Sequence, residues 1–314
     1  MKIKFIVPIP DSSYYIQQAL IQCNNFSKFG YDVDAHYVVG IVRGTPNVNV
    51  VRIAQSDLLK AKFHLYQDHR ESKVYSASLK PYLMYRYFSD YPQEKDNIYI
   101  YLDPDVIFLE PMDFSKYIEG GSWYGSNTGS YLDSKYIKSK GEGLLEEMCG
   151  FAGIDPNVVV ANDKNIIGAQ YLTKNNTAEF WKDVYQNSYR MYKFVNGLKG
   201  KYFKPEMKYW LQVWTTEMWI TLWELWKRGI ETRHTPEWDF HWANHQMKDR
   251  KHKIFHNAGI SEQDQTKTEH FAKRAYEHKT PFNKVLPVSD NSLSMVYVDE
   301  IRDTEKNYPT LIWD

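Results

Sequence analysis

Apolar segments alternate with amphipathic ones through the first 110 residues, and this alternation limits the possible folds more than any other feature. The run Lys4–Ile9 is apolar and ends at Pro10, as expected of a strand buried on both faces of a parallel sheet. Apolar residues then recur near helical spacing over Tyr14–Phe29, and Gly30 stands where a helix takes a left-handed residue. We therefore predict an α/β fold, a three-layer sandwich with a mostly parallel central sheet.

The following segments continue the pattern. Asp32–Val39 and Asn47–Ile53 are predicted as the second and third strands. Ser76–Tyr91 is predicted as a helix, with Pro81 tolerated in its first turn. Asn97–Leu109 then contains the fourth strand. Because ligands of such sheets bind beyond the carboxyl ends of the strands, we expect the functional residues there.

The remainder of the chain is less regular. Two stretches rich in glycine and serine, Glu119–Ser134 and Gly141–Gly153, are predicted as mobile surface loops. A strand over Asn165–Leu172, a helix over Ala178–Phe194 and a largely helical segment over Tyr209–Trp226 are expected after them. With no internal repeat and no clean boundary, residues 1–314 are predicted to form a single domain.

Charge and cysteine content exclude several classes of protein. Lysine plus arginine number 39 and so do aspartate plus glutamate, so no net charge draws the chain to nucleic acid or to an anionic membrane. Two cysteines, Cys23 and Cys149, are too few for a disulfide scaffold. No stretch approaches 18 apolar residues, and the start of the chain lacks a signal-like segment. We expect a cytoplasmic protein with no membrane contact.

The residues Asp103-Pro104-Asp105 interrupt the apolar segment 97–113 and carry the clearest chemical signal. The two carboxylates stand two residues apart, so an extended backbone would direct both side chains to the same side. Paired carboxylates at a strand end suit a hard divalent cation that also holds phosphate oxygens. The alternative is that the two aspartates only form a turn fixed by the proline.

At these residues the sequence resembles the GT-A glycosyltransferases, whose DxD motif holds a metal ion on the diphosphate of a nucleotide sugar. Within that superfamily it is most similar to the hydroxyproline O-arabinosyltransferase-like group. The similarity lies in LDPDVIFLEPM at 102–112, WTTEMWITLW at 214–223 and KIFHNAG at 253–259. It implies a GT-A domain with a nucleotide-donor half at 1–113 and an acceptor half at 114–314 that includes the C-terminal metal ligand.

The resemblance also implies the metal ligands. Asp103 and Asp105 match the DxD motif, and His256 stands where GT-A enzymes often supply a third ligand near the C-terminus. The expected ion is Mn²⁺ or Mg²⁺, since a neutral imidazole beside carboxylates suits such ions. The alternative for His256 is a histidine that caps a strand and bonds only to backbone.

Several residues are expected to contact a donor, by the resemblance a UDP-sugar. Lys80 opens a helix from which it could reach the diphosphate. The end of the first strand would hold the base and ribose, and two small residues with an amide would lie beneath the donor sugar. The alternative for the lysine is a solvated surface position. The alternative for the small residues is simple close packing against a neighbouring strand. The residues of these two strand segments are Pro8, Ile9, Pro10, Gly168, Ala169 and Gln170.

Glu217 is the expected catalytic residue, because inverting GT-A enzymes place a base carboxylate at about this point of the fold. A carboxylate in the first turn also stabilises its helix, which is the plainer role. The tryptophans around it, from Trp210 to Trp226, are expected to be mostly core. One or two of them near Glu217, or Trp238 and Trp242, should face substrate, because indoles bind sugar faces well.

The expected activity is thus a metal-dependent hexosyl- or pentosyltransferase in a bacterial cell or a phage-infected host. Its hydroxyl acceptor could be a glycan, a protein or a hydroxymethylated base in phage DNA, the last requiring base flipping. A nucleotidyltransferase is the first alternative, although the first strand ends without the glycine-rich loop that cradles a triphosphate. A non-catalytic carbohydrate-binding protein of the same fold is the second.

Overall fold

The computed structural model describes residues 2–260 and 269–313. Seven strands form the larger sheet in the order β3-β2-β1-β4-β7-β6-β8, and three strands form a smaller sheet in the order β5-β10-β9. The pairs β1–β2, β2–β3 and β6–β8 are parallel, whereas β6–β7 is antiparallel. A mostly parallel sheet flanked by helices confirms the predicted α/β class.

The chain divides into two compact units, each built from separate segments. Unit 1 comprises Met1–Lys2, His69–Tyr99 and Tyr117–Pro236, and unit 2 comprises Ile3–Asp68, Ile100–Lys116 and Glu237–Asp314. Strand β4 (Ile98–Tyr101) begins in unit 1 and ends in unit 2. The expected division into a donor half and an acceptor half concerns function and stays a prediction.

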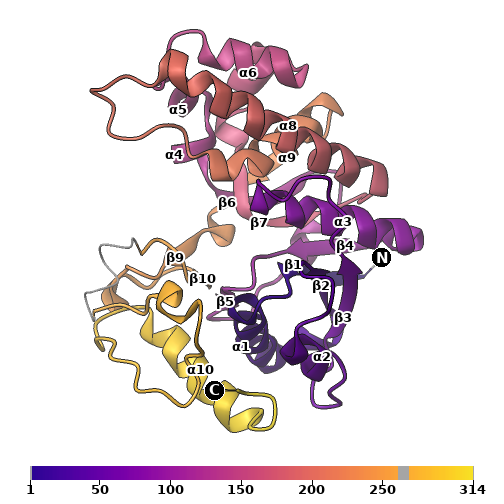
Figure 1. The fold of residues 1–314 in the computed structure, drawn as a ribbon, viewed down its shortest axis with the longest axis vertical. Coiled ribbons are helices and arrows are strands. Elements are labelled where there is room, and N and C mark those ends of the chain that lie inside the picture. The colour runs from indigo at the N-terminus through magenta and orange to yellow at the C-terminus, as the bar shows by residue number, and fades with distance from the viewer. Residues whose placement is uncertain (1, 261–268, 314) are drawn as a thin grey trace. The chain divides into compact units, whose positions relative to one another are not determined.

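Unit 2 contains three parallel strands of the larger sheet and the whole smaller sheet. In the smaller sheet, β10 pairs antiparallel with β5 and parallel with β9. Helix α10 near the C-terminus lies beside α1 near the N-terminus, as Figure 1 shows. The strands are β1 (Ile3–Pro10), β2 (Ala35–Ile41), β3 (Lys62–Gln67), β5 (Val106–Phe108), β9 (Phe240–Trp242) and β10 (Ile254–His256). The helices are α1 (Ser13–Phe29), α2 (Val48–Ala54) and α10 (Met295–Asn307).

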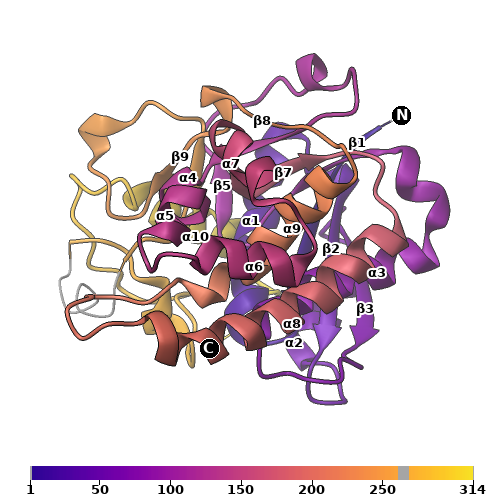
Figure 2. The same ribbon diagram turned by 90° about the horizontal axis from the view of Figure 1, so that it is seen from above.

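Unit 1 is mainly helical, and its long helix α8 lies alongside both α3 and α9 (Figures 1 and 2). Its strands are β6 (Trp123–Asn127), β7 (Ile167–Thr173) and β8 (Thr232–His234). Its helices are α3 (Leu79–Asp90), α4 (Gly129–Leu132), α5 (Ser134–Lys138), α6 (Leu144–Ala152), α7 (Pro156–Ala161), α8 (Ala178–Tyr202) and α9 (Thr216–Lys227).

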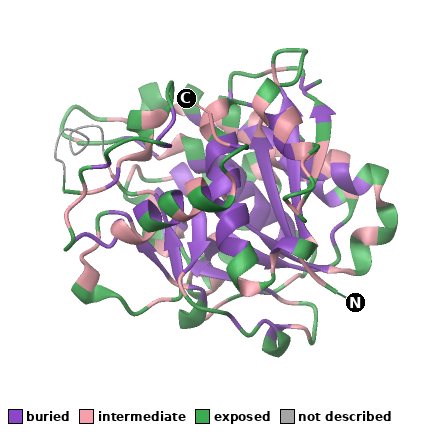
Figure 3. Cartoon of the chain, turned by 90° about the horizontal axis from the view of Figure 1, so that it is seen from below, coloured by how far each residue is buried: buried purple, intermediate pink, exposed green. Residues whose placement is uncertain are grey.

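The cores of both units follow from the apolar runs in the sequence. The strands are largely buried, with exposed residues concentrated in connecting segments and on outer helix faces (Figure 3). Within β1, the residues from Phe5 to Ile9 are all buried, as a strand with neighbours on both faces requires. Helix α1 ends at Gly30 with φ 72°, the left-handed C-cap predicted from the sequence.

The second and third predicted strands need correction. Asp32–Asp34 form a 3₁₀ turn, and the strand starts only at Ala35, because aspartates favour turns over extended pairing. The segment 47–53 is not a strand. Its residues form helix α2, whose N-terminus is capped by the Asn47 side chain accepting a hydrogen bond from Asn49 N at 2.9 Å. The third strand is instead β3. The prediction failed because a short apolar run does not distinguish a helix from a strand.

The predicted mobile loops at 119–134 and 141–153 are also wrong. They contain β6, α4 and α6, and the Trp123 side chain is fully buried with its indole N–H donated to Lys174 O at 3.0 Å. Burial of a few large side chains orders these glycine-rich segments. Conversely, residues 209–212 are not helical; a 3₁₀ turn at Val213–Thr215 precedes helix α9. Helix α8 runs on to Tyr202, beyond the predicted end.

Cys23 and Cys149 are free and buried, as expected of a chain without a disulfide scaffold. In the described part of the chain, no helix combines the length and the apolar character that crossing a bilayer requires.

Candidate functional site

The Asp103-Pro104-Asp105 segment forms the tight connection between β4 and β5 in unit 2, and a buried glutamine fixes its backbone. Gln22 of α1 donates its side-chain amide to Asp103 O at 2.9 Å and to Val106 O at 2.7 Å. The hydroxyl of Tyr37 in turn donates to Gln22 Oε1 at 3.0 Å. The side chain of Gln22 therefore fixes the backbone of the connection, and this restricts the positions of both carboxylates.

Strand pairing brings His256 to these carboxylates. Strand β10 runs antiparallel to β5, and the register sets His256 opposite Val106. Asn257 N donates to Asp105 O at 2.9 Å and continues the pairing past the strand end. One ligand atom from each of Asp103, Asp105 and His256 lies within 4.8 Å of the other two. The structure thus brings together the three residues that the sequence singled out as metal ligands.

The surroundings of His256 fit a metal ligand better than a strand cap. Its Nε2 lies 3.4 Å from Asp105 Oδ1, and its Nδ1 is buried with no hydrogen-bond partner among residues 2–260 and 269–313. The ring packs against both Phe240 and Trp242, with the Trp242 ring stacked on it at 5.6 Å between centroids. A histidine that capped a strand would bond to backbone. Two carboxylates and one imidazole form a donor set that suits Mn²⁺ or Mg²⁺.

Lys273 is a site residue that the sequence reasoning missed. Its ammonium group forms an ion pair with Asp105 Oδ2. Burial would raise the pKa of Asp105, but the positive charge of Lys273, together with the interaction with His256, outweighs burial and holds that pKa well below its usual range. Asp105 is therefore an ionised carboxylate inside the protein, the state that a cation ligand requires. No motif marked Lys273, since it follows the last matched stretch.

Glu217 lies in the first turn of α9 in unit 1 and belongs to a buried polar cluster. Its Oε2 accepts a hydrogen bond from the Tyr75 hydroxyl, and its backbone N–H donates to the same hydroxyl at 2.9 Å. Its Oε1 lies 3.5 Å from Lys80 Nζ. Burial, reinforced by the negative charge of Glu217, raises the pKa of Tyr75 well above its ordinary value. The cluster thus brings together Lys80 and Glu217, two of the predicted site residues. Its third member, Tyr75, was not predicted from the sequence.

Gly168, Ala169 and Gln170 lie in β7 at an irregularity of the sheet. The pairing with β6 shifts register there, and Ala169 takes a φ of 62°, which is strained for an L-residue. A side chain at position 168 would clash with Met218 and Thr128. The small residue at 168 is therefore explained by close packing. Contact of these three residues with a donor sugar stays a prediction.

The end of β1 lies in unit 2, the unit of the aspartates. Pro8, Ile9 and Pro10 pair with Val38, Val39 and Gly40 of β2. The next residue, Asp11, orders the loop beyond β2 by accepting from Val42 N at 3.1 Å and Asn47 N at 3.2 Å. The carboxyl end of β1 is thus well ordered; its contact with a nucleoside stays a prediction.

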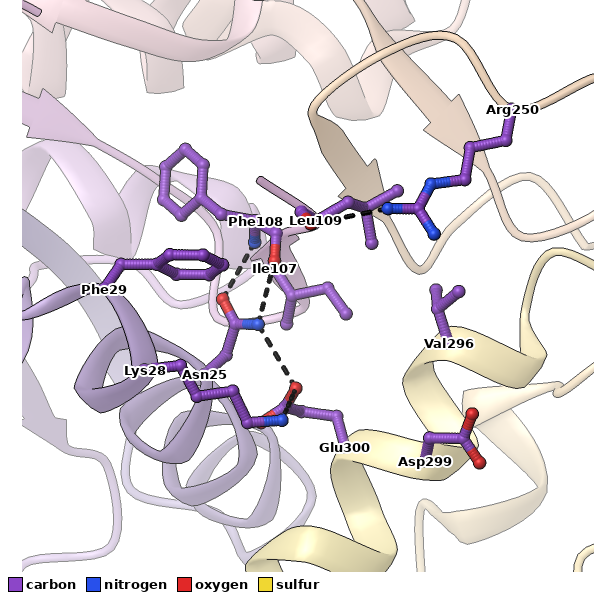
Figure 4. Close-up of a pocket in the computed structure, with 10 residues that line it drawn as sticks. All are labelled: Asn25, Lys28, Phe29, Ile107, Phe108, Leu109, Arg250, Val296, Asp299 and Glu300. Carbon is purple, nitrogen blue, oxygen red and sulfur yellow. Dashed lines mark hydrogen bonds and ion pairs between the residues drawn. The ribbon is translucent and has the colours of Figure 1, made fainter. Parts of the chain in front are cut away.

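A pocket of about 210 Å³ in unit 2 contains none of the predicted site residues (Figure 4). Asn25 donates to Phe108 O at 2.9 Å and to Glu300 Oε2 at 3.2 Å, and Lys28 pairs with the same carboxylate at 2.8 Å. These polar groups satisfy one another and join α1, β5 and α10. The pocket is therefore explained as part of the packing of unit 2.

Comparison with known proteins gives little further guidance. No protein-family model matches the chain, and no curated protein matches it. Among solved structures, the apo structure of WbbM, a bifunctional glycosyltransferase, aligns with 98% of this chain at a TM-score of 0.49 and 10% identity. The aligned region is 51% of that protein, so the chain spans about half its length.

Proposed function

We propose that this chain is a metal-dependent glycosyltransferase that moves a sugar from a nucleoside-diphosphate donor, by resemblance a UDP-sugar, to a hydroxyl acceptor. One observation carries the proposal: His256, about 150 residues farther along the chain, has a ligand atom within 4.8 Å of ligand atoms of Asp103 and Asp105 in unit 2. The GT-A resemblance and the α/β class support the same function. The finer assignments, namely a hexosyl or pentosyl donor and a cytoplasmic location, stay predictions.

In the proposed reaction, the bond between the anomeric carbon and the diphosphate oxygen breaks while the acceptor oxygen bonds to that carbon. Asp103, Asp105 and His256 would hold a divalent cation, which when bound neutralises charge on the leaving diphosphate. Asp105 enters this role already ionised, because Lys273 and His256 stabilise its charge. The acceptor loses its proton as its oxygen attacks.

Glu217 is the residue proposed to receive the acceptor hydroxyl. Tyr75 donates a hydrogen bond to its Oε2, and Lys80 Nζ lies 3.5 Å from its Oε1. In the proposed reaction Oε1 accepts the hydroxyl proton or orients the hydroxyl, and Lys80 binds the donor diphosphate. Pro8–Pro10 and Gly168–Gln170 are the proposed contacts to the nucleoside and to the donor sugar.

Donor hydrolysis tests the proposal without a known acceptor. Purified protein with Mn²⁺ is given UDP-glucose, UDP-galactose, UDP-arabinofuranose, UDP-N-acetylglucosamine or a GDP-sugar, and released nucleoside diphosphate is followed. We expect Mn²⁺-dependent release from one donor, lost in Asp105→Asn and in His256→Gln. Asp299→Asn, which changes an exposed carboxylate of α10, should release normally.

Silence across the donor panel, with no donor-induced thermal shift, would contradict the proposal. Circular dichroism of the two ligand variants establishes whether they are folded. A folded His256→Gln variant with unaltered Mn²⁺ dependence would remove His256 from the proposed metal site.

A further inference from the structure

Trp214 differs from the other tryptophans in its exposure. All ten lie in the described part of the chain; seven are buried, two are half-buried, and Trp214 is 58% exposed. A single exposed aromatic side chain is common, so the exposure of Trp214 becomes informative only together with its neighbours. Trp238, one of the tryptophans expected to face substrate, is fully buried and cannot do so.

A second aromatic ring lies next to Trp214 in unit 1. The rings of Tyr131 and Trp214 are inclined by only 28°, with centroids 6.4 Å apart. Tyr131 is half-buried in α4 and Trp214 lies in the 3₁₀ turn before α9. We call these two side chains the aromatic platform.

Hydrogen bonds fix both segments of the platform. The indole N–H of Trp219, in α9, donates to Leu132 O at 3.0 Å and thereby ties α4 to α9. The Tyr136 hydroxyl accepts from Gln212 N at 2.9 Å, just before the turn that carries Trp214. A surface held this way in advance loses little conformational freedom when a ligand binds.

The platform adjoins the Glu217 cluster. Trp214 O accepts a hydrogen bond from the Tyr75 hydroxyl at 2.9 Å, and the same hydroxyl contacts the Glu217 carboxylate. The turn that carries the Trp214 ring is therefore joined through Tyr75 to the residue proposed to receive the acceptor hydroxyl.

The residues around the platform indicate the chemistry of the ligand. The segments 127–133 and 212–217 read NTGSYLD and QVWTTE, with hydroxyl and amide side chains, two carboxylates and no lysine or arginine. Polyanions such as nucleic acids are bound by stacking together with several basic side chains. These two segments supply none, and Lys80 of the adjoining Glu217 cluster is the residue proposed to bind the donor diphosphate. Flat aromatic rings beside neutral polar groups suit the apolar faces and hydroxyl rims of sugar rings.

We propose that Tyr131 and Trp214 form an acceptor subsite that binds a pyranose ring of a neutral glycan. The inference rests on the proposed glycosyltransferase function and narrows its acceptor to a glycan, in preference to a protein or a modified DNA base. Trp214 supplies the main stacking surface, and Tyr131 extends it. The subsite holds the acceptor sugar so that one of its hydroxyls reaches Glu217.

The test uses the full chain labelled with ¹⁵N at its tryptophan indoles. The Trp214 resonance is assigned by its loss in Trp214→Phe, and the protein is titrated with maltopentaose, cellopentaose, mannopentaose, chitopentaose and the oligonucleotide dT10. We expect at least one oligosaccharide to shift the Trp214 signal more than the other indole signals. In Trp214→Ala its affinity, followed by ligand-detected NMR, should fall at least tenfold, with a smaller loss in Tyr131→Ala.

Phe151→Ala is the matched control, because Phe151 is another exposed ring stacked on a neighbour, Phe194, at 4.2 Å. It should bind the oligosaccharide as the unaltered chain does. The inference is overturned if no oligosaccharide shifts Trp214, if dT10 shifts it more than any sugar, or if Trp214→Ala binds equally well. The donor panel separates the two proposals: no donor hydrolysis together with no donor-induced thermal shift overturns the glycosyltransferase function, whereas a Trp214 shift by an oligosaccharide would still identify a carbohydrate-binding surface.

Discussion

Lys273 forms an ion pair with Asp105, so a cation from the protein itself occupies one oxygen of a proposed metal ligand. A metal ion that takes that oxygen must displace the ammonium group or share the carboxylate with it. The same pair also stabilises the metal-free protein, because Asp105 is buried and would otherwise lack a full positive partner. Lys273 is therefore expected to stabilise the folded, metal-free protein and to lower its affinity for a metal ion.

Replacing Lys273 by methionine should separate these two effects. We expect the metal-free protein to lose about 3 kcal/mol of stability, since one partner of a buried ion pair is removed. Affinity for Mn²⁺ alone, measured by isothermal titration calorimetry, should rise by roughly tenfold, or about 1.4 kcal/mol. Lys284→Met changes an exposed lysine and should alter neither quantity. Weaker Mn²⁺ binding by a folded Lys273→Met variant would show that the lysine does not compete with the metal.

Gly168→Ala should destabilise unit 1. The added methyl group would clash with the side chains of Met218 and Thr128, and overpacking of this kind costs about 1–3 kcal/mol. Gly197→Ala is the control: it lies in the long helix α8 with open space around it, so alanine should stabilise by about 0.5–1 kcal/mol. Urea unfolding of both variants measures the difference. Equal stability of the two variants would mean that the strand at 168 can move away from α9.

Tyr75→Phe should weaken the Glu217 cluster. The lost hydroxyl leaves Glu217 N and Trp214 O without this partner, at a cost of about 1–3 kcal/mol in the free energy of unfolding. Turnover should fall as well, because Glu217 loses the contact that orients its carboxylate. Tyr209→Phe alters an exposed tyrosine and should change stability by less than about 0.5 kcal/mol. Wild-type turnover in a folded Tyr75→Phe variant would exclude orientation of Glu217 by Tyr75.

His241 predicts a pH dependence of stability. Its Nε2 accepts from Lys251 N at 2.8 Å and His252 N at 2.9 Å, so that nitrogen cannot take up a proton while these bonds persist. Burial, followed by the positive charges of His252, His245 and neighbouring basic residues, lowers the pKa of His241 to about 4. The unfolded chain binds the proton near pH 6.5.

The contribution of neutral His241 to the free energy of unfolding is therefore fully present above about pH 6.5 and is lost as the pH falls toward 4. Between pH 7 and pH 5 we expect a loss of about 2 kcal/mol in the free energy of unfolding from His241. Urea unfolding at pH 5, 6 and 7 should show a shallower pH slope in His241→Asn than in the unaltered chain. His278→Asn, at an exposed histidine, should keep the original slope. Identical slopes in all three proteins would contradict this account.

The sequence predicted the α/β class because buried parallel strands produce long apolar runs, such as β1, that few other folds need. The prediction failed for α2, because its seven residues have a mixed apolar pattern that fits either a strand or a helix. Only the capping hydrogen bond of Asn47 in the structure identifies the helix. The prediction also failed for β6, because the burial of Trp123 depends on contacts with residues far along the chain. Local propensity does not encode such contacts.

The same limit applies to the candidate site. Asp103 and Asp105 could be singled out from their position after a buried strand, whereas His256 was located by family resemblance. What joins them is the β5–β10 register, which no spacing in the sequence reveals. Lys273 and Tyr75 were missed because a lone lysine or tyrosine carries no pattern. Each gains its role only from the carboxylate that it contacts in the folded chain.

Unit 2 takes its three segments from the beginning, the middle and the end of the chain, and the proposed metal ligands come from the last two. During synthesis, both aspartates leave the ribosome long before His256, and Lys273 follows later still. A nascent chain that stops short of β10 would carry the DxD residues but neither the strand that pairs with β5 nor the cation that neutralises Asp105. The three proposed metal ligands would thus be complete only in a chain that includes residue 256, and a chain truncated before β10 would leave the Asp105 carboxylate without either of these partners.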